Sequence, residues 1–147
     1  YKFYVYNKEI LKNGGIVVEI LINHKSSEPI YEQIDTQIKQ MILSGTLQDG
    51  DIITSVRMLA KELGVGVLTV QKAYDKLQNE GIIETVIGKG TYISIKNMSL
   101  LEDEKYQALE VKAKELVKSA KQYNVELEDI FSLIKLLYDD ECCGGES

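Results

Sequence analysis

The sequence holds few of the residues that most catalytic and metal sites use. Its 147 residues include one histidine and two cysteines, and tryptophan is absent. His24 lies in a polar stretch without an evident partner, and no glycine-rich phosphate loop is present. Cys142 and Cys143 are adjacent, which is neither a metal-ligand spacing nor a disulfide framework, and a pair of exposed thiols is favoured over a redox sensor. We therefore expect no enzyme, no metal site and no cofactor.

Long hydrophobic runs are missing as well. No apolar run approaches the roughly 18–20 residues that a bilayer-spanning helix needs. Residues 1–6 are largely aromatic and lack the basic stretch and following apolar run of a signal peptide. The content of 44% hydrophobic and 27% charged residues is ordinary for a soluble globular protein, so we expect a cytoplasmic location.

Positive charge is scarce overall, since the net charge is −6 and Arg57 is the only arginine. The distribution of the charge is more informative than its sum. Residues 29–98 carry seven basic and eight acidic side chains, whereas residues 99–147 carry six basic and twelve acidic ones. A polyanion such as DNA would therefore bind the middle segment, and the acidic C-terminal segment should face away from it.

Hydrophobic periodicity predicts three helices in the middle segment. The first covers residues 32–43, the second residues 56–63 with Ser55 as its N-cap, and the third residues 67–80. Gly64 interrupts the chain between the second and third helices, as a tight turn requires. Four apolar residues at helical spacing form the expected inner face of the third helix: Val70, Ala73, Tyr74 and Leu77.

Two short β-branched runs follow the third helix. Residues 82–87 and 91–95 are joined by Gly88-Lys89-Gly90, which predicts a hairpin. The order of helix, helix, tight turn, helix and hairpin is that of a winged helix-turn-helix, so we expect a mainly α fold with a small β wing at about residues 29–96.

The C-terminal third predicts two more helices, at residues 101–123 and 126–138, with a break at Asn124. Two helices alone cannot bury their many apolar side chains, and a second copy of the chain is the simplest partner. The predicted dimerisation residues are Leu109, Leu116, Ala120, Ile130, Leu133, Ile134 and Leu137. Residues 142–147 are expected to form a flexible tail.

The third helix would be the one that reads DNA, because a helix fits the major groove and its first turn reaches the base edges. Gln71 can pair with adenine, Lys72 and Lys76 can neutralise phosphates, and the tip of the wing can approach the minor groove. Arg57 can reach a phosphate or a guanine. The predicted DNA-contacting residues are Ser55, Arg57, Gly66, Val67, Leu68, Thr69, Gln71, Lys72, Gly88, Lys89 and Gly90.

These patterns carry a resemblance to a known family. The segments that match are residues 29–34 (PIYEQI), 42–47 (ILSGTL), 55–60 (SVRMLA), 69–74 (TVQKAY) and 88–92 (GKGTY). In this arrangement the chain resembles the GntR family of bacterial regulators, and its short two-helix tail is similar to the YtrA-like branch. The resemblance implies a homodimeric repressor that binds a palindromic operator. It also implies that Arg57, residues 66–69, Gln71 and Gly88 contact DNA.

The chain departs from the family pattern at three places. Polar or basic residues usually stand where it has Gly66, Val67 and Leu68, which cannot donate side-chain hydrogen bonds, although Val67 or Leu68 can touch a thymine methyl. We therefore expect either weak direct readout of the bases or an A·T-biased operator. Thr54 stands where the family usually has proline. Residues 1–16 have no counterpart, and we interpret them as an upstream extension of the reading frame or an extra strand.

The sequence thus predicts four parts. These are the N-terminal extension 1–16, a DNA-binding domain at residues 17–98, a dimerisation segment at residues 99–141, and the tail 142–147. A strand is expected at residues 16–22, where the extension meets the DNA-binding domain. One alternative remains open, in which the winged helix binds a protein and not an operator. The two C-terminal helices leave little room for an effector pocket, and nothing in the sequence names an effector.

Overall fold

The computed structural model describes residue 16 and residues 18–143, and side chains as far as residue 140. The predictions for residues 1–15 and for the last four residues of the tail lie outside the described residues. The chain divides into two compact units, Tyr1–Glu102 and Asp103–Ser147. Within the described part of the chain, no helix is both long and apolar enough to cross a membrane.

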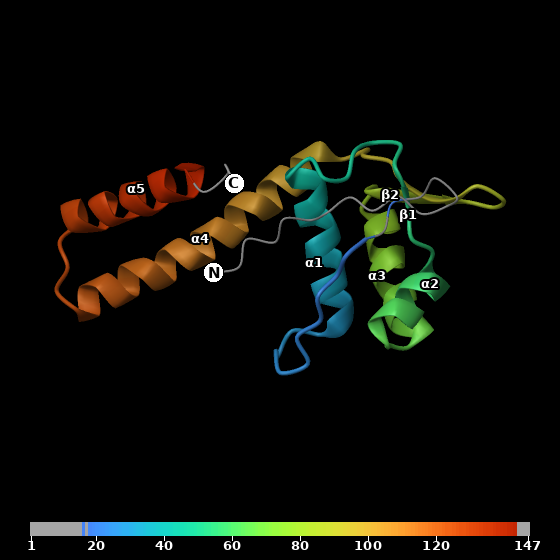
Figure 1. Ribbon diagram of the computed structural model, residues 1–147, viewed down its shortest axis with the longest axis horizontal. Helices are drawn as coiled ribbons and strands as arrows, with labels where there is room; N and C mark the ends of the chain where they lie inside the picture. The colour runs from blue at the N-terminus through green and yellow to red at the C-terminus, as the bar shows by residue number, and fades with distance from the viewer. Residues whose placement is uncertain (1–15, 17, 144–147) are drawn as a thin grey trace. The chain divides into compact units, whose positions relative to one another are not determined.

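The three predicted helices of the first unit are present (Figure 1). Helix α1 spans Ile30–Leu43, so it begins two residues earlier than its apolar stripe indicates, with Pro29 as N-cap. Helix α2 spans Val56–Leu63 and helix α3 spans Val67–Asn79. Proline is tolerated at the start of a helix because the first amide hydrogens have no partner within the helix.

Local capping sets the limits of α2. The Ser55 hydroxyl accepts a hydrogen bond from the backbone N–H of Met58 at 3.3 Å, as the sequence predicts for an N-cap. Gly64 ends the helix with a φ of 65°, a left-handed conformation that glycine adopts at no steric cost. The chain therefore turns sharply and enters α3 three residues later.

A three-stranded antiparallel sheet completes the first unit. The predicted hairpin consists of β2 (Ile83–Val86) and β3 (Gly90–Ile93). A third strand, β1 (Ile52–Ile53), pairs with the outer side of β3 and gives the order β1-β3-β2. The sequence did not predict β1, because two residues show no periodicity and their pairing depends on a strand about 40 residues away.

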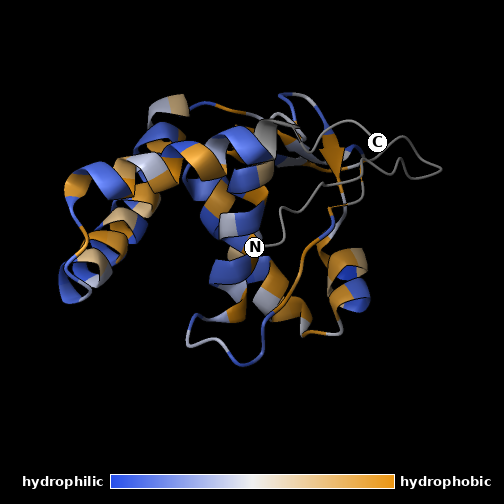
Figure 2. Ribbon diagram, turned by 60° about the vertical axis from the view of Figure 1, so that its left-hand side comes forward, coloured by the Kyte–Doolittle hydropathy of each residue, from blue (hydrophilic) through white to orange (hydrophobic). Residues whose placement is uncertain are grey.

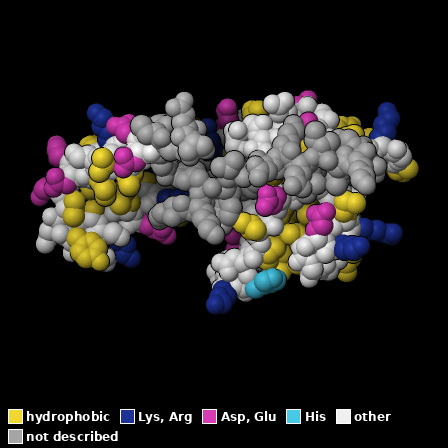
Figure 3. Space-filling view, viewed as in Figure 1, with side chains coloured by type: hydrophobic (Ala, Val, Ile, Leu, Met, Phe, Trp, Pro, Cys, Tyr) yellow, Lys and Arg dark blue, Asp and Glu magenta, His cyan; other side chains and the backbone are white. Residues whose placement is uncertain are grey.

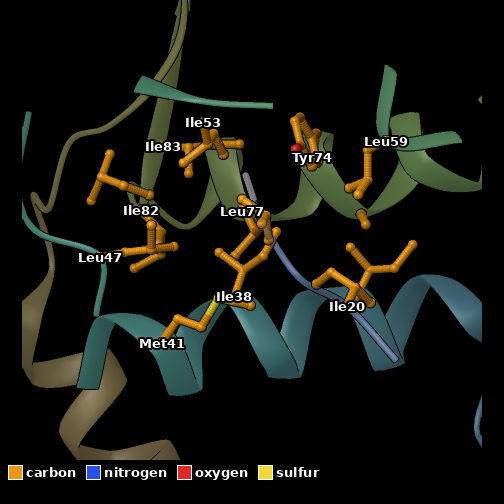
Figure 4. Close-up of a cluster of buried hydrophobic side chains, with 14 of the residues drawn as sticks. Ile20, Ile38, Met41, Leu47, Ile53, Leu59, Tyr74, Leu77, Ile82 and Ile83 are labelled. Atoms are coloured by element: carbon orange, nitrogen blue, oxygen red, sulfur yellow. The ribbon is translucent and has the colours of Figure 1, made fainter. Parts of the chain in front are cut away.

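The core lies where α1, α2 and α3 meet the sheet (Figure 4). Ile38 and Met41 of α1 lie toward Leu77 of α3, and Leu59 of α2 lies beside Tyr74 at the other end of the cluster. All four predicted inner residues of α3 are buried. At about 25 cal/mol per Å² of buried apolar surface, this packing is the main stabilising term of the unit.

The predicted strand at residues 16–22 is wrong. Ile16 makes one isolated parallel bridge to Ile53, but residues 18–22 form no strand. Two glutamines of α1 satisfy this backbone instead. Gln37 accepts the Leu21 N–H at 2.9 Å and donates to the Leu21 carbonyl at 2.8 Å, and Gln33 bonds the segment in the same way farther along. The segment has an apolar pattern because Ile16, Val18 and Ile20 are buried in the hydrophobic core.

The second unit is a helical hairpin. Helix α4 spans Met98–Gln122 and begins in the first unit, and α5 spans Leu127–Cys143. The predicted break at Asn124 is confirmed by its φ of 54°. Helix α5 continues five residues beyond the predicted end at residue 138. It therefore includes Cys142 and Cys143, which the sequence analysis assigned to a flexible tail.

Almost nothing in the second unit is buried. Among the described residues 105–140, only Ala120 and Ile130 are classed as buried. Apolar residues run along both helices in Figure 2, and they gather on this unit in the space-filling view of Figure 3. The hairpin thus leaves most of its apolar surface in water, unlike the first unit.

Candidate nucleic-acid interface

A groove on the first unit brings together residues from α2, α3 and the β2–β3 hairpin. It measures about 440 Å³ and opens to solvent. Its lining consists of Ser55, Val56, Arg57, Val67, Gln71, Tyr74, Gln78, Thr85, Gly90 and Thr91. Five of the predicted DNA-contacting residues are among them, although they span 36 positions in sequence.

The first turn of α3 faces outward beside this groove. Leu68 is 83% exposed and Val67 is 47% exposed. Gln71 and Lys72 are also exposed, whereas Thr69 is half-buried. Because Val70 on the opposite face is completely buried, α3 presents one side to the core and the other to solvent. A helix that enters the major groove needs this orientation.

Arg57 and Ser55 lie at the start of α2, on the rim of the groove. Arg57 is exposed in the first turn, so its guanidinium is free to approach a phosphate or a base edge. The Ser55 oxygen already accepts the Met58 N–H. Its own O–H can still donate, so capping and a phosphate contact are compatible.

Tyr74 couples α3 to the start of α2, which sequence analysis did not find. Its hydroxyl donates to the Thr54 carbonyl at 2.7 Å in a buried position. Burial raises the pKa of Tyr74, with Glu62 adding to the effect, so the hydroxyl stays protonated and keeps donating. The Thr54 hydroxyl in turn accepts the Val18 N–H and donates to the Ile16 carbonyl. Thr54, at the position where the family pattern usually has proline, thus connects Ile16 and Val18 to α3 through Tyr74.

The two lysines predicted to meet phosphates behave differently. The Lys72 ammonium lies 3.8 Å from the centre of the Tyr31 ring, an exposed cation–π contact that leaves its charge accessible. Lys76 forms ion pairs with Glu32 at 3.0 Å and Asp35 at 2.9 Å. Desolvation opposes its charged form, but these two carboxylates raise the pKa of Lys76 overall. The charge of Lys76 is therefore already balanced within the protein, which makes Lys72 the better placed of the two lysines for a phosphate.

The wing tip has the geometry that a close approach to DNA requires. Gly88 and Gly90 have φ values of 81° and 95°, which disfavour any residue with a Cβ. Lys89 between them is exposed. The preceding Ile87 is fully exposed, and the Thr85 and Thr91 hydroxyls bond across the strands at 3.0 Å. Figure 3 shows side chains of the Lys and Arg class projecting from the first unit.

The predicted dimerisation residues separate into two groups. Ala120 and Ile130 are buried within the single chain, near the turn of the hairpin. The remaining five are 38–56% exposed: Leu109, Leu116, Leu133, Ile134 and Leu137. In the described part of the chain, no group of three or more His, Cys, Asp or Glu side chains is placed to hold a metal ion.

Comparison with known proteins places this architecture in a family. Residues 30–93 match the model of the bacterial regulatory proteins of the gntR family. The transcriptional repressor YtrA of Bacillus subtilis is 42% identical over 121 residues, which cover 82% of this chain and 93% of YtrA. The longer Bacillus subtilis repressor NagR is 40% identical over 73 residues, and the match covers 50% of this chain and 30% of NagR.

A solved structure extends the likeness to both units. A GntR family transcriptional regulator from Listeria monocytogenes has a TM-score of 0.60 and 32% sequence identity, with coverage of 76% of this chain and 96% of that one. The predicted winged helix-turn-helix and the predicted resemblance are both confirmed. The chain belongs to the gntR family of bacterial regulatory proteins.

Proposed function

We propose that this protein represses transcription by binding a palindromic operator as a homodimer. Residues 17–98 form the DNA-binding domain and residues 99–141 the dimerisation segment. The observation that carries the proposal is the outward first turn of α3, flanked by the guanidinium of Arg57 and by the hairpin tip. A repressor of chromosomal genes works in the cytoplasm, and occlusion of the polymerase accounts for the repression.

Base readout falls to the exposed residues of α3. Gln71 can pair with adenine through its amide, and the Thr69 hydroxyl can bond a base or a phosphate. Leu68 has no polar group and is 83% exposed, so it suits the methyl group of thymine. This composition favours A·T base pairs in the half-site.

Phosphate contacts supply the remaining affinity. Arg57, Lys72 and Lys89 are three exposed cations around α3 and the wing, and each phosphate that they neutralise releases counterions. The wing backbone at Gly88 and Gly90 can lie close to the adjacent minor groove. Few cations take part, so affinity should rest on two half-sites bound together.

A second copy of the chain is the proposed partner of the second unit. Five of its predicted interface residues are large, apolar and exposed, and lie on both α4 and α5. Burying them between two hairpins would form a four-helix arrangement with an apolar centre. The two DNA-binding domains of such a dimer would enter successive major grooves about one helical turn apart.

In vitro selection of bound DNA from a random pool tests the proposal directly. The expected product is a palindrome with A·T-rich half-sites, bound less tightly as salt increases. Recovery of no common sequence, together with weak binding at low salt, would refute operator binding. It would favour the alternative that the winged helix contacts a protein.

A further inference from the structure

The side chain of Gln71 is not free on the surface of α3. Its Nε2 donates a hydrogen bond to the Oδ1 of Asp75 at 2.7 Å. The two residues are four positions apart, so they lie one above the other on the same exposed face of the helix. This is the face that the proposed function places in the major groove.

An unrestrained glutamine is an ambiguous reader of purines. Its amide has one acceptor oxygen and two N–H donors. Adenine presents the N7 acceptor and the N6 donor in the major groove, whereas guanine presents two acceptors, N7 and O6. One donor with one acceptor matches adenine, and two donors match guanine. Glutamine by itself can satisfy either base.

A carboxylate beside the amide removes this ambiguity. An ionised aspartate only accepts hydrogen bonds, so Asp75 can hold the NH₂ group of Gln71 but never its oxygen. The bond therefore sets which end of the amide points toward Asp75. It also consumes one of the two N–H donors.

We propose that Asp75 is a specificity-determining residue that makes Gln71 select adenine over guanine. With one N–H held by Asp75, Gln71 retains one donor and one acceptor, which are the complement of adenine. Guanine would find a single donor for two acceptors. This inference rests on the proposed function, since it assumes that α3 reads DNA.

The same carboxylate should lower affinity for all DNA. A negative charge on the exposed face of α3 repels phosphates, and Asp75 lines a surface pocket together with Lys72. A side-chain pair four residues apart also gives a helix a small amount of stability. That structural role would change the melting temperature but would not change base preference, which separates it from the proposal.

Selection from a random DNA pool with four versions of the full chain tests the proposal. These are the wild type, Gln71→Ala, Asp75→Ala and the matched control Asp75→Glu, which keeps a carboxylate that only accepts hydrogen bonds. Gln71→Ala should identify the base pair read by Gln71 as the one whose preference is lost. At that base pair, Asp75→Ala should lower the preference for adenine over guanine about tenfold, and Asp75→Glu should retain most of it.

The outcomes distinguish a failure of operator binding from a failure of the role of Asp75. If the wild type selects no sequence, operator binding itself fails and the inference falls with it. If Gln71→Ala alters one base pair and Asp75→Ala leaves the adenine preference there intact, the proposed function stands and the role of Asp75 is overturned. An equal loss in Asp75→Ala and Asp75→Glu would show that a carboxylate held beside Gln71 does not set the preference and would also overturn it. Melting temperatures within a few degrees of the wild type show that the variants remain folded.

Discussion

The two units of this chain are built from the same kind of element but differ in what they bury. In the first unit, α1, α2, α3 and the sheet enclose a continuous set of fully buried side chains. In the second unit, α4 and α5 enclose two buried residues and leave leucines, isoleucines and aromatics in solvent. The first unit thus buries its apolar side chains within one chain, whereas the second leaves an exposed apolar surface, which supports the proposed pairing with a second copy.

The largest effect should come from charging the exposed face of α5. The double substitution Leu133→Asp and Leu137→Asp places two carboxylates at an i,i+4 pair of the proposed interface, so the dimer should dissociate to monomers in sedimentation equilibrium. Loss of simultaneous binding to two half-sites should weaken operator affinity at least about a hundredfold.

The control for this variant is Lys135→Asp. It changes the net charge of the chain by the same amount, but residue 135 lies on the opposite side of α5 from Leu133 and Leu137. The control should remain a dimer. A dimer that survives both aspartates would move the interface to another surface.

The next effect should appear in the core of the first unit. Leu77→Ala removes a fully buried side chain between α1 and α3 and should cost about 2–5 kcal/mol in the free energy of unfolding. Urea unfolding at one fixed protein concentration measures this change. Leu68→Ala on the exposed face of the same helix should cost less than about 0.5 kcal/mol. Equal costs at the two positions would contradict the assignment of inner and outer faces.

A smaller effect is expected from removing the guanidinium at the start of α2. Arg57→Ala should weaken operator binding by about 1–3 kcal/mol if the guanidinium reads a base, with little change in unfolding. Fluorescence anisotropy over a series of salt concentrations measures the affinity and its salt slope. Lys61→Ala, which removes a cation from the last turn of α2, is the matched control. Unchanged affinity in Arg57→Ala would remove this residue from the interface.

The smallest effect concerns the N-cap of α2. Ser55→Ala removes the acceptor for the Met58 N–H and should lower the free energy of unfolding by about 1 kcal/mol. Ser55→Asp keeps a capping oxygen and should restore stability, but its charge should reduce operator affinity. If Ser55→Asp bound the operator as well as the wild type, residue 55 would lie away from the phosphates.

Much of the first unit could be predicted, because the sequence signals for its helices and its hairpin are local. The limits of α2 follow from Ser55 and Gly64, and the buried face of α3 follows from apolar residues at helical spacing. The positions around the groove were also predictable, because the family resemblance supplied the order in which these elements pack.

Long-range contacts between side chains set the limits of sequence analysis. Lys76 has the same chemistry as Lys72, but the carboxylates that neutralise it come from α1, more than 40 positions away. The hydrogen bond from Tyr74 to Thr54 joins residues 20 positions apart, and no periodic pattern in the sequence indicates it. The segment after Ile16 has an apolar pattern suited to a strand, and the hydrogen bonds of its backbone to the side chains of Thr54 and of two glutamines of α1 explain why it needs no neighbouring strand.

The sequence by itself determined the helices, their caps, the hairpin turn and the family, because each depends on residues within a few positions of one another or on a motif read in order. The tertiary structure alone decided that Lys76 and not Lys72 is paired with carboxylates, that Gln71 is held by Asp75, and how little of α4 and α5 is covered. These properties depend on distances between side chains and on solvent exposure, which are fixed only when the elements pack.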